Sequence, residues 1–152
     1  MLQFAVARLA CVVIALLVAL PAAGQTVIDG DSLEVDGRKY RLNGIDAPDI
    51  DQICPDGWPA GNEARHYLGQ LIDGKQVVCI PLVGKRNDEI VGLCRADGLD
   101  LGSAMVTAGQ AFAFVPYSAQ YIAQEAVAVR MGRGVHAHHC ISPWEWRARL
   151  SR

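Results

Sequence analysis

Acidic side chains concentrate around two turns in the first third of the chain. Asp29 and Asp31 flank a glycine, while Asp46 and Asp49 flank an alanine–proline pair. Carboxylates gathered by two turns are the oxygen ligands that a hard cation such as calcium requires. Arg41 lies between the two turns and could hold a phosphate through two parallel hydrogen bonds. The alternative is that each aspartate only shapes its own turn, because aspartate beside glycine or proline is a common turn signal.

Two short strands are expected to carry this arginine. Leu33 and Val35 alternate with polar neighbours, which is the period of a half-buried strand. Tyr40 and Leu42 repeat the pattern after an Asp-Gly pair, which is a signal for a tight hairpin turn. Arg41 should therefore point away from the face that buries its two apolar neighbours.

The rest of the chain predicts helices mixed with strands, so the fold class is α+β. The expected helices span residues 59–72, 101–108 and 118 to about 131. Further strands are expected at residues 26–28, 77–80 and 91–94, with a polar turn over residues 84–89. Five or so short strands with about three helices favour a small five-stranded β-barrel of the oligonucleotide-binding (OB) type.

Capping signals set the ends of these helices. Asp100 is expected to cap the N-terminus of the second helix, and Ser118 that of the third. Gly74 and Gly109 follow the first and second helices, and glycine at such a position adopts the left-handed conformation that ends a helix. The apolar period and the caps therefore indicate the same boundaries.

The first 24 residues have the features of an export signal. Arg8 gives a weakly positive start, residues 9–20 contain no charge, and small residues follow Pro21. This apolar run is too short to span a hydrocarbon core of about 30 Å, although an uncleaved anchor remains open. The sequence predicts a signal peptide over residues 1–24 and one secreted or periplasmic domain over residues 25–152, without stable membrane association after cleavage.

The charge balance limits the partners of this domain. The chain carries 14 Lys and Arg against 16 Asp and Glu, a net charge of −2, and cleavage of the leader would remove Arg8. Tight non-specific binding to nucleic acid normally needs a basic surface, because neutralised phosphates supply most of the affinity. The composition therefore disfavours a tight DNA-binding protein, and we expect a monomer.

Four cysteines follow the predicted leader. An even number of cysteines in an exported domain favours disulfides. Cys79 and Cys94 lie near-opposite in the two strands of an expected hairpin, where they can approach closely enough to bridge. Cys54 would then pair with Cys140 and tie the acidic loop to the tail. Four free buried thiols are the alternative.

Several motifs, in order along the chain, resemble the staphylococcal-nuclease-like (thermonuclease) family. Residues 29–31, 41–42 and 46–49 are similar to its Asp-Gly-Asp turn, Arg-Leu strand and Asp-x-Pro-acid turn. The similarity continues through residues 58–64, 100–109, 117–121 and 143–147. It covers essentially the whole chain after the leader, and it implies a calcium-dependent phosphodiester hydrolase.

The resemblance assigns roles to individual residues. Asp31, Asp46 and the backbone carbonyl of Ala47 match the calcium ligands of the family. Arg41 matches its first phosphate-binding arginine, and Asp49 stands where the family usually has its catalytic glutamate. The implied mechanism is in-line attack of a metal-associated water, positioned or deprotonated by a carboxylate, on a phosphodiester. Single-stranded or unstructured nucleic acid is the implied substrate.

The chain departs from the family at several positions. Val91 stands where the resemblance places a second arginine, while Glu89 and Phe114 stand where tyrosines are common. Losing one preorganised charge-stabilising donor costs about 10²–10³ in rate. Asp49 is one methylene shorter than glutamate, which changes its hydrogen-bond reach. Arg86 could compensate for the missing arginine from the preceding loop.

The C-terminal segment has two further features. Four clustered residues could bind zinc or copper: His136, His138, His139 and Cys140. A disulfide at the cysteine would remove one of these ligands, so an exposed tail without metal is favoured. Trp144 and Trp146 could stack on bases, but their period-two spacing favours packing of the tail against the barrel.

Two functions therefore compete. The first is an exported calcium-dependent phosphodiesterase or nuclease of reduced activity. The second is a catalytically inactive nuclease-like binding or accessory protein, a role that resembles family members encoded with exopolysaccharide (succinoglycan-type) biosynthesis. The complete set of expected calcium ligands favours the first function. The missing arginine, the acidic balance and the altered base favour the second.

Overall fold

The structure is a computed structural model that describes residues 24–151. The predicted signal peptide covers residues 1–24, and of these only Gly24 lies within the described part. No helix within the described residues is long and apolar enough to cross a membrane.

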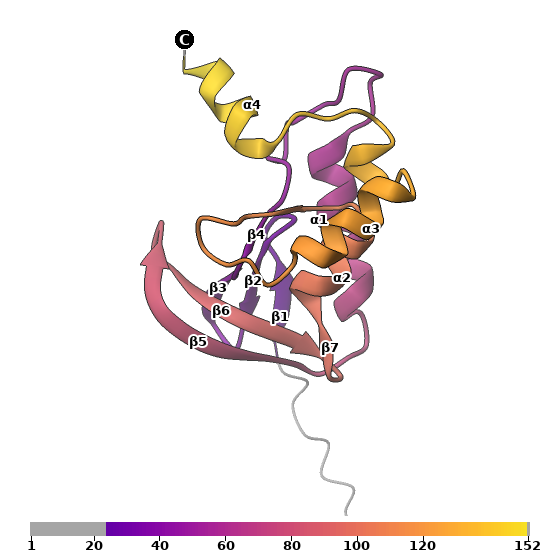
Figure 1. The fold of residues 1–152 in the computed structure, drawn as a ribbon. Helices are drawn as coiled ribbons and strands as arrows, with labels where there is room; N and C mark the ends of the chain where they lie inside the picture. The colour runs from indigo at the N-terminus through magenta and orange to yellow at the C-terminus, as the bar shows by residue number, and fades with distance from the viewer. Residues whose placement is uncertain (1–23, 152) are drawn as a thin grey trace, which may run out of the picture.

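A mixed, curled sheet forms one side of the domain (Figure 1). Its strands are β1 (Gln25–Val27), β2 (Ser32–Val35), β3 (Arg38–Leu42), β5 (Val77–Arg86), β6 (Glu89–Ala96) and β7 (Leu99–Asp100). The order across the sheet is β1-β2-β3-β6-β5, and β7 also pairs with β6. The pairing of β3 with β6 is parallel, and the other pairings in this sheet are antiparallel. A separate small sheet pairs β4 (Ile45–Asp46) with β8 (Phe112–Ala113).

Four α-helices and one 3₁₀ helix occur among residues 24–151. They are α1 (Ala60–Ile72), α2 (Leu101–Thr107), α3 (Ile122–Arg130), η1 (Gly134–His136) and α4 (Pro143–Leu150). Figure 1 shows α1, α2 and α3 gathered on one side of the sheet, whereas α4 stands apart from them. This arrangement confirms the predicted α+β class with an OB-like curled sheet, and it adds a fourth helix.

One apolar core lies between the sheet and the helices. Leu33, Tyr40 and Leu42 of the sheet are at most 5% exposed, and Leu68 of α1 is fully buried. Removing this apolar surface from water is the main favourable contribution to folding. Arg41 lies between two of these buried residues in β3 and projects to the opposite face, as the alternating pattern predicts.

Local signals explain why the elements begin and end where they do. Asp36 and Gly37 both have positive φ, at 51° and 75°, which matches the tight turn predicted between β2 and β3. The Asp100 side chain accepts a hydrogen bond of 2.9 Å from the Ser103 N–H and caps α2 as predicted. Gly74, with φ of 65°, follows α1.

Two boundary predictions are wrong. Ser118 does not cap the third helix, because Tyr121 is its N-cap and the Ser118 hydroxyl accepts from the Gln120 N–H in a preceding turn. The predicted polar turn over residues 84–89 is too long. β5 and β6 extend into it, and only Asn87 and Asp88, both with positive φ, remain as the turn.

Both predicted disulfides are present. Cys79 and Cys94 are direct partners in the antiparallel register of β5 and β6, with Cα atoms 4.0 Å apart. Cys54 and Cys140 join the loop after β4 to the segment before α4, across 86 positions of sequence. The hairpin register was therefore sufficient to select the connectivity.

Candidate active site

Three side chains form the centre of the predicted site: Asp31 just before β2, Arg41 in β3 and Asp46 in β4. Ser32 lies opposite Arg41 in the antiparallel pairing of β2 with β3, which brings Asp31 beside the arginine. The Arg41 Nη2 atom donates to Asp31 Oδ2 at 2.7 Å and to Asp46 Oδ1 at 2.9 Å. The two aspartates are only 2% and 0% exposed. The fold thus gathers two predicted metal ligands and the predicted phosphate-binding arginine into one buried cluster.

Ala47 contributes a backbone contact to this cluster. Its N–H donates to Asp31 Oδ2 at 2.8 Å. Gly30 permits the close approach, because a Cβ atom there would lie 2.7 Å from the Ala47 Cβ and 2.6 Å from the Ala64 Cβ. The turn before β2 therefore packs directly against helix α1 and the segment after β4, and this contact fixes Asp31 relative to Ala47.

Asp49 lies at the edge of the cluster, and helix α1 fixes its backbone. A Cβ atom at Gly61 would overlap the Asp49 carbonyl oxygen, so only glycine allows the first turn of α1 to pack this closely. The Asp49 side chain is 32% exposed, far more than that of Asp46. It is thus the carboxylate of the site that water can reach.

Arg147 completes the cluster, although the sequence interpretation missed it. It donates from Nη2 to Asp46 Oδ2 at 2.5 Å and from Nη1 to Asp49 Oδ1 at 2.8 Å. The arginine comes from α4, which begins with a capping box formed by Ser142 and Glu145. The Ser-Pro-Trp-Glu sequence could have signalled this helix. This sequence carries no signal for which part of the domain the helix packs against.

The segment before α4 is anchored to the loop between β4 and α1. The Cys54–Cys140 disulfide joins the two covalently. His138 Nδ1 lies 2.6 Å from Asp56 Oδ2, and the His138 ring stacks on Trp58 with a centroid distance of 4.3 Å. The prediction of an exposed tail is only partly right, because Ala137 and His139 are exposed but long-range contacts hold the segment in place.

The alternative zinc or copper site in the tail is not supported. Cys140 is in a disulfide, and no group of three His, Cys, Asp or Glu side chains in residues 24–151 is placed to hold a metal ion. Trp144 packs against Phe112 and Phe114, with ring centroids 5.8 and 5.4 Å away. The tail does pack on the domain as expected, but through a helix rather than through a period-two strand.

Comparison with known proteins identifies the family. Residues 39–135, well over half of the chain, match the family described as staphylococcal nuclease homologue. The chain belongs to the staphylococcal nuclease homologue family. The matched segment includes Arg41, Asp46 and Asp49 but neither Asp31 nor Arg147.

Three relatives of this staphylococcal nuclease homologue differ in what their names describe. The succinoglycan biosynthesis protein ExoI of Rhizobium meliloti (strain 1021) is 34% identical over 98 residues, which cover 60% of this chain and 51% of that protein. The probable staphylococcal-like nuclease CAN3 of Oryza sativa subsp. japonica is 33% identical over 138 residues, covering 88% of this chain and 35% of that protein. CAN2 of the same plant is also 33% identical over 138 residues, which are 36% of its length. The chain spans about half or less of the length of these relatives.

Val91 marks the main departure of this staphylococcal nuclease homologue from the family pattern. It pairs with Arg41 in the parallel register of β3 and β6, so an apolar side chain stands where the resemblance implies a second arginine. Glu89, at the start of β6, lies close by, since the Ser32 hydroxyl is 3.3 Å from Glu89 Oε2. The same hydroxyl is 3.3 Å from Asp31 Oδ1. The departures thus remove one positive charge and add a negative one near the carboxylates.

Arg86 lies on the same side of Arg41 as Val91. Its guanidinium carbon is 5.8 Å from the ring centroid of Phe114 and 5.6 Å from that of Tyr117. Arg86, Arg41 and Val91 line one narrow cavity of about 10 Å³, which has room for about one water molecule. Arg86 therefore stacks on aromatic rings beside the site, and it makes none of the ion pairs found within residues 24–151.

Burial raises the pKa of Asp31 well above its usual value. The negative charges of Asp29 and Asp46 act in the same direction, while Arg41 and the Ala47 N–H lower the pKa. Burial dominates because a charged carboxylate loses its hydration in the interior. Protons therefore compete with any cation for this carboxylate.

The donor set fits a hard cation in its chemistry, since Asp31 and Asp46 offer buried carboxylate oxygens. Protein donors already contact all four of these oxygens. Arg41 and Arg147 hold one oxygen each on Asp46. A cation that binds this carboxylate therefore competes with a guanidinium group for its oxygens.

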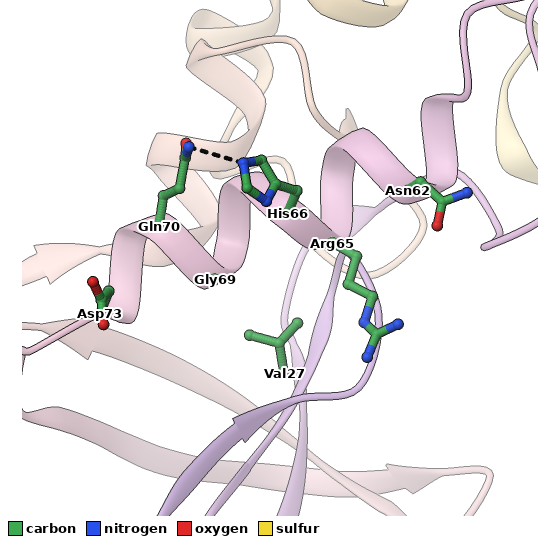
Figure 2. A pocket seen from close by; sticks show the side chains of 7 residues that line it. All are labelled: Val27, Asn62, Arg65, His66, Gly69, Gln70 and Asp73. Atoms are coloured by element: carbon green, nitrogen blue, oxygen red, sulfur yellow. Dashed lines mark hydrogen bonds between the residues drawn. The ribbon is translucent and has the colours of Figure 1, made fainter.

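A cavity of about 520 Å³ lies on another part of the surface, beside α1 and β1 (Figure 2). Arg65, His66 and Asp73 are among its polar lining residues, and the side chains of His66 and Gln70 are 3.0 Å apart along α1. None of the predicted site residues lines this cavity. This cavity is larger than the one beside Arg41. The gathered carboxylates and arginines nevertheless favour the carboxylate cluster as the functional site.

Proposed function

We propose that this staphylococcal nuclease homologue is an exported calcium-dependent phosphodiesterase that cleaves single-stranded or unstructured nucleic acid at a reduced rate. The observation that carries the proposal is the buried cluster of Asp31, Asp46 and Arg41, with Asp49 at its water-accessible edge. The two rice relatives whose printed names describe staphylococcal-like nucleases support the same class of reaction.

The residues of the cluster divide the work of hydrolysis. Asp31, Asp46 and the carbonyl of Ala47 would hold calcium, which when bound polarises a phosphoryl oxygen and lowers the pKa of a bound water. Both ion pairs of Arg41 use Nη2, so its Nε and Nη1 donors remain for the non-bridging oxygens of the phosphate. Asp49 orients the attacking water in line with the leaving oxygen and accepts its proton.

Two features support a reduced rate. Val91 provides no charge beside Arg41, so the developing charge on the phosphate has one guanidinium fewer than the family pattern implies. Asp49 is one methylene shorter than the glutamate that the resemblance implies, so its carboxylate reaches less far toward the attacking water. A phosphodiester can therefore be bound and cleaved, but with a less stabilised transition state.

A second candidate function is a catalytically inactive binding or accessory protein. Val91 is the observation that favours it, because a site with one guanidinium group stabilises the charge that develops on a phosphate less well than a site with two. The relative named as a succinoglycan biosynthesis protein supports a role in exopolysaccharide biosynthesis. In this alternative the acidic cluster would serve stability alone.

Export is part of the proposal. Disulfides persist in oxidising compartments, and the described residues contain two of them. We therefore propose that the protein is secreted or periplasmic. We also propose that it is a monomer and that it does not stay bound to a membrane once its leader is removed.

Cleavage of a fluorescent single-stranded oligonucleotide, with calcium or with a chelator, tests the enzyme function. We expect slow cleavage that requires calcium and falls about 100-fold or more in Arg41→Lys, because lysine cannot form the paired hydrogen bonds. The matched control is Arg38→Lys, at an exposed position of the same strand. A folded wild-type protein without calcium-dependent cleavage would exclude the nuclease and leave the accessory function.

A further inference from the structure

We propose that Arg147 is an internal counter-ion of the cation site, so that a docked helix α4 and a bound calcium ion are alternatives at Asp46. The inference rests on the proposed calcium site and adds a residue from outside the segment that matches the family, residues 39–135. It makes the C-terminal helix a determinant of how tightly the site binds a cation.

Each oxygen of Asp46 contacts the guanidinium group of an arginine. Its side chain is fully buried, with Arg41 on Oδ1 at 2.9 Å and Arg147 on Oδ2 at 2.5 Å. A buried carboxylate that loses its partner is strongly destabilising, because the uncompensated charge has no water to solvate it. Arg147 therefore supplies at Oδ2 what a calcium ion would supply there.

Arg147 is the more easily displaced of the two arginines. The Arg41 side chain is 13% exposed and lies within β3, between two core residues. The Arg147 side chain is 36% exposed, and Pro143 is the single buried residue of α4. A movement of α4 breaks the contacts of Trp144 with Phe112 and Phe114, but these two rings are not among the buried core residues, so calcium can replace Arg147 without disturbing the core.

The anchored tail keeps Arg147 close to the site. The Cys54–Cys140 disulfide and the His138–Asp56 contact hold the segment just before α4 on the loop that follows β4. Tethering of this kind makes the competition intramolecular and raises the effective concentration of the guanidinium group. Calcium must therefore outcompete a cation that cannot diffuse away.

The same displacement changes the proposed base. Arg147 Nη1 donates to Asp49 Oδ1 while Nη2 donates to Asp46 Oδ2, so one guanidinium group spans both carboxylates. When calcium takes the place of Arg147 at Asp46, Asp49 loses its partner as well. Binding of calcium at Asp46 would then also free Asp49 from its contact with Arg147.

Calorimetric titration of the full chain with calcium chloride tests the inference without any need for activity. We expect Arg147→Gln to bind calcium at least tenfold more tightly than wild type, because a competing positive charge is gone. Arg149→Gln, at an exposed position of the same helix, is the matched control and should leave the affinity unchanged. Equal affinity in wild type and Arg147→Gln, weaker binding in the variant, or no binding in either would overturn the inference.

The two disulfides provide a second comparison. Replacing Cys54 and Cys140 by serine should also raise calcium affinity, because the tether is lost, whereas replacing Cys79 and Cys94 should not. Equal calcium affinity in the two double variants would contradict the role of the tether. Failure of the nuclease proposal is distinguishable, since an inactive protein whose Arg147→Gln variant binds calcium more tightly would still support the counter-ion.

Discussion

Val91 lies directly beside Arg41 in the parallel pairing of β3 with β6. Side chains at paired positions of neighbouring strands project to the same face, so a residue at position 91 can reach the same group that Arg41 contacts. Valine supplies only apolar surface at this point. The residue at position 91 therefore decides whether one or two guanidinium groups lie on this face of β3 and β6.

Restoring the charge at this position should raise activity. We expect Val91→Arg combined with Asp49→Glu to cleave a single-stranded oligonucleotide more than tenfold faster than wild type in the presence of calcium. One transition-state donor is worth about 3 kcal/mol, or about two orders of magnitude. The two single variants, assayed alongside, assign the gain to the arginine or to the longer base.

An inert double variant that is shown to be folded would contradict the degraded-nuclease interpretation. Substantial activity in the wild type would have a different meaning, because another residue would then supply the missing charge. Arg86, which lines one cavity with Arg41 and Val91, is the first residue to substitute in that case.

Asp31 should be necessary for cation binding. We expect Asp31→Ala to abolish the calorimetric signal of calcium, since it removes one of the two buried carboxylates of the site. Asp51→Ala, at an exposed position of the same acidic segment, should retain the signal. A wild-type protein with neither binding heat nor a shift in melting temperature at millimolar calcium would show that the carboxylates are structural.

Helix α1 offers a matched pair of glycines for a stability test. A Cβ atom at Gly61 would overlap the Asp49 carbonyl oxygen, so we expect Gly61→Ala to destabilise the fold by about 3 kcal/mol. A Cβ atom at Gly69 would meet no other atom within 4 Å, and Gly69→Ala should stabilise the helix by about 0.5–1 kcal/mol. Urea unfolding measures both changes, and similar effects at the two positions would refute the packing argument.

Tyr121 should make stability depend on alkaline pH. Burial raises its pKa above the usual value near 10, and the charge and hydrogen bond of Asp100 raise it further. The neutral phenol is favoured in the folded state, so its contribution is fully present below pH 10 and is lost as the pH rises toward the folded pKa.

The corresponding variant is Tyr121→Phe. We expect it to lose about 1.5–3 kcal/mol of unfolding free energy at pH 7, where the hydrogen bond to the Asp100 carboxylate is intact. The difference from wild type should shrink above pH 10. Tyr117→Phe, at a residue that is 57% exposed, is the control. A difference that does not change between pH 7 and pH 11 would contradict the proposed cause.

Local signals were enough to predict much of the fold. The Asp36 and Gly37 turn, the Asp100 cap and the pairing of Cys79 with Cys94 depend on a few neighbouring residues, and the structure confirms each of them. Ser118 has the right residue type for a cap but initiates a separate turn instead. Serine favours both roles through the same hydrogen bond, so local sequence could not distinguish them.

The centre of the site was predictable for a different reason. Arg41 and Asp31 are brought together by a hairpin whose register follows from its own turn, so their contact is local in origin. Arg147 reaches Asp46 through the docking of a helix, and no pattern of charges or spacing encodes that contact. Tertiary docking of this kind depends on the whole surface, so the tryptophans indicated that the tail packs on the domain but not that its arginine reaches the site.

The distance along the chain between Asp46 and Arg147 has a consequence for biosynthesis. The two residues are 101 positions apart, and protein chains are made from the N-terminus onward. The residues of the sheet and of α1, α2 and α3 are therefore synthesised before those of α4. A nascent chain therefore passes through a stage in which Asp46 and Asp49 have no arginine from α4, and their contacts with Arg147 form only once that later segment has been made.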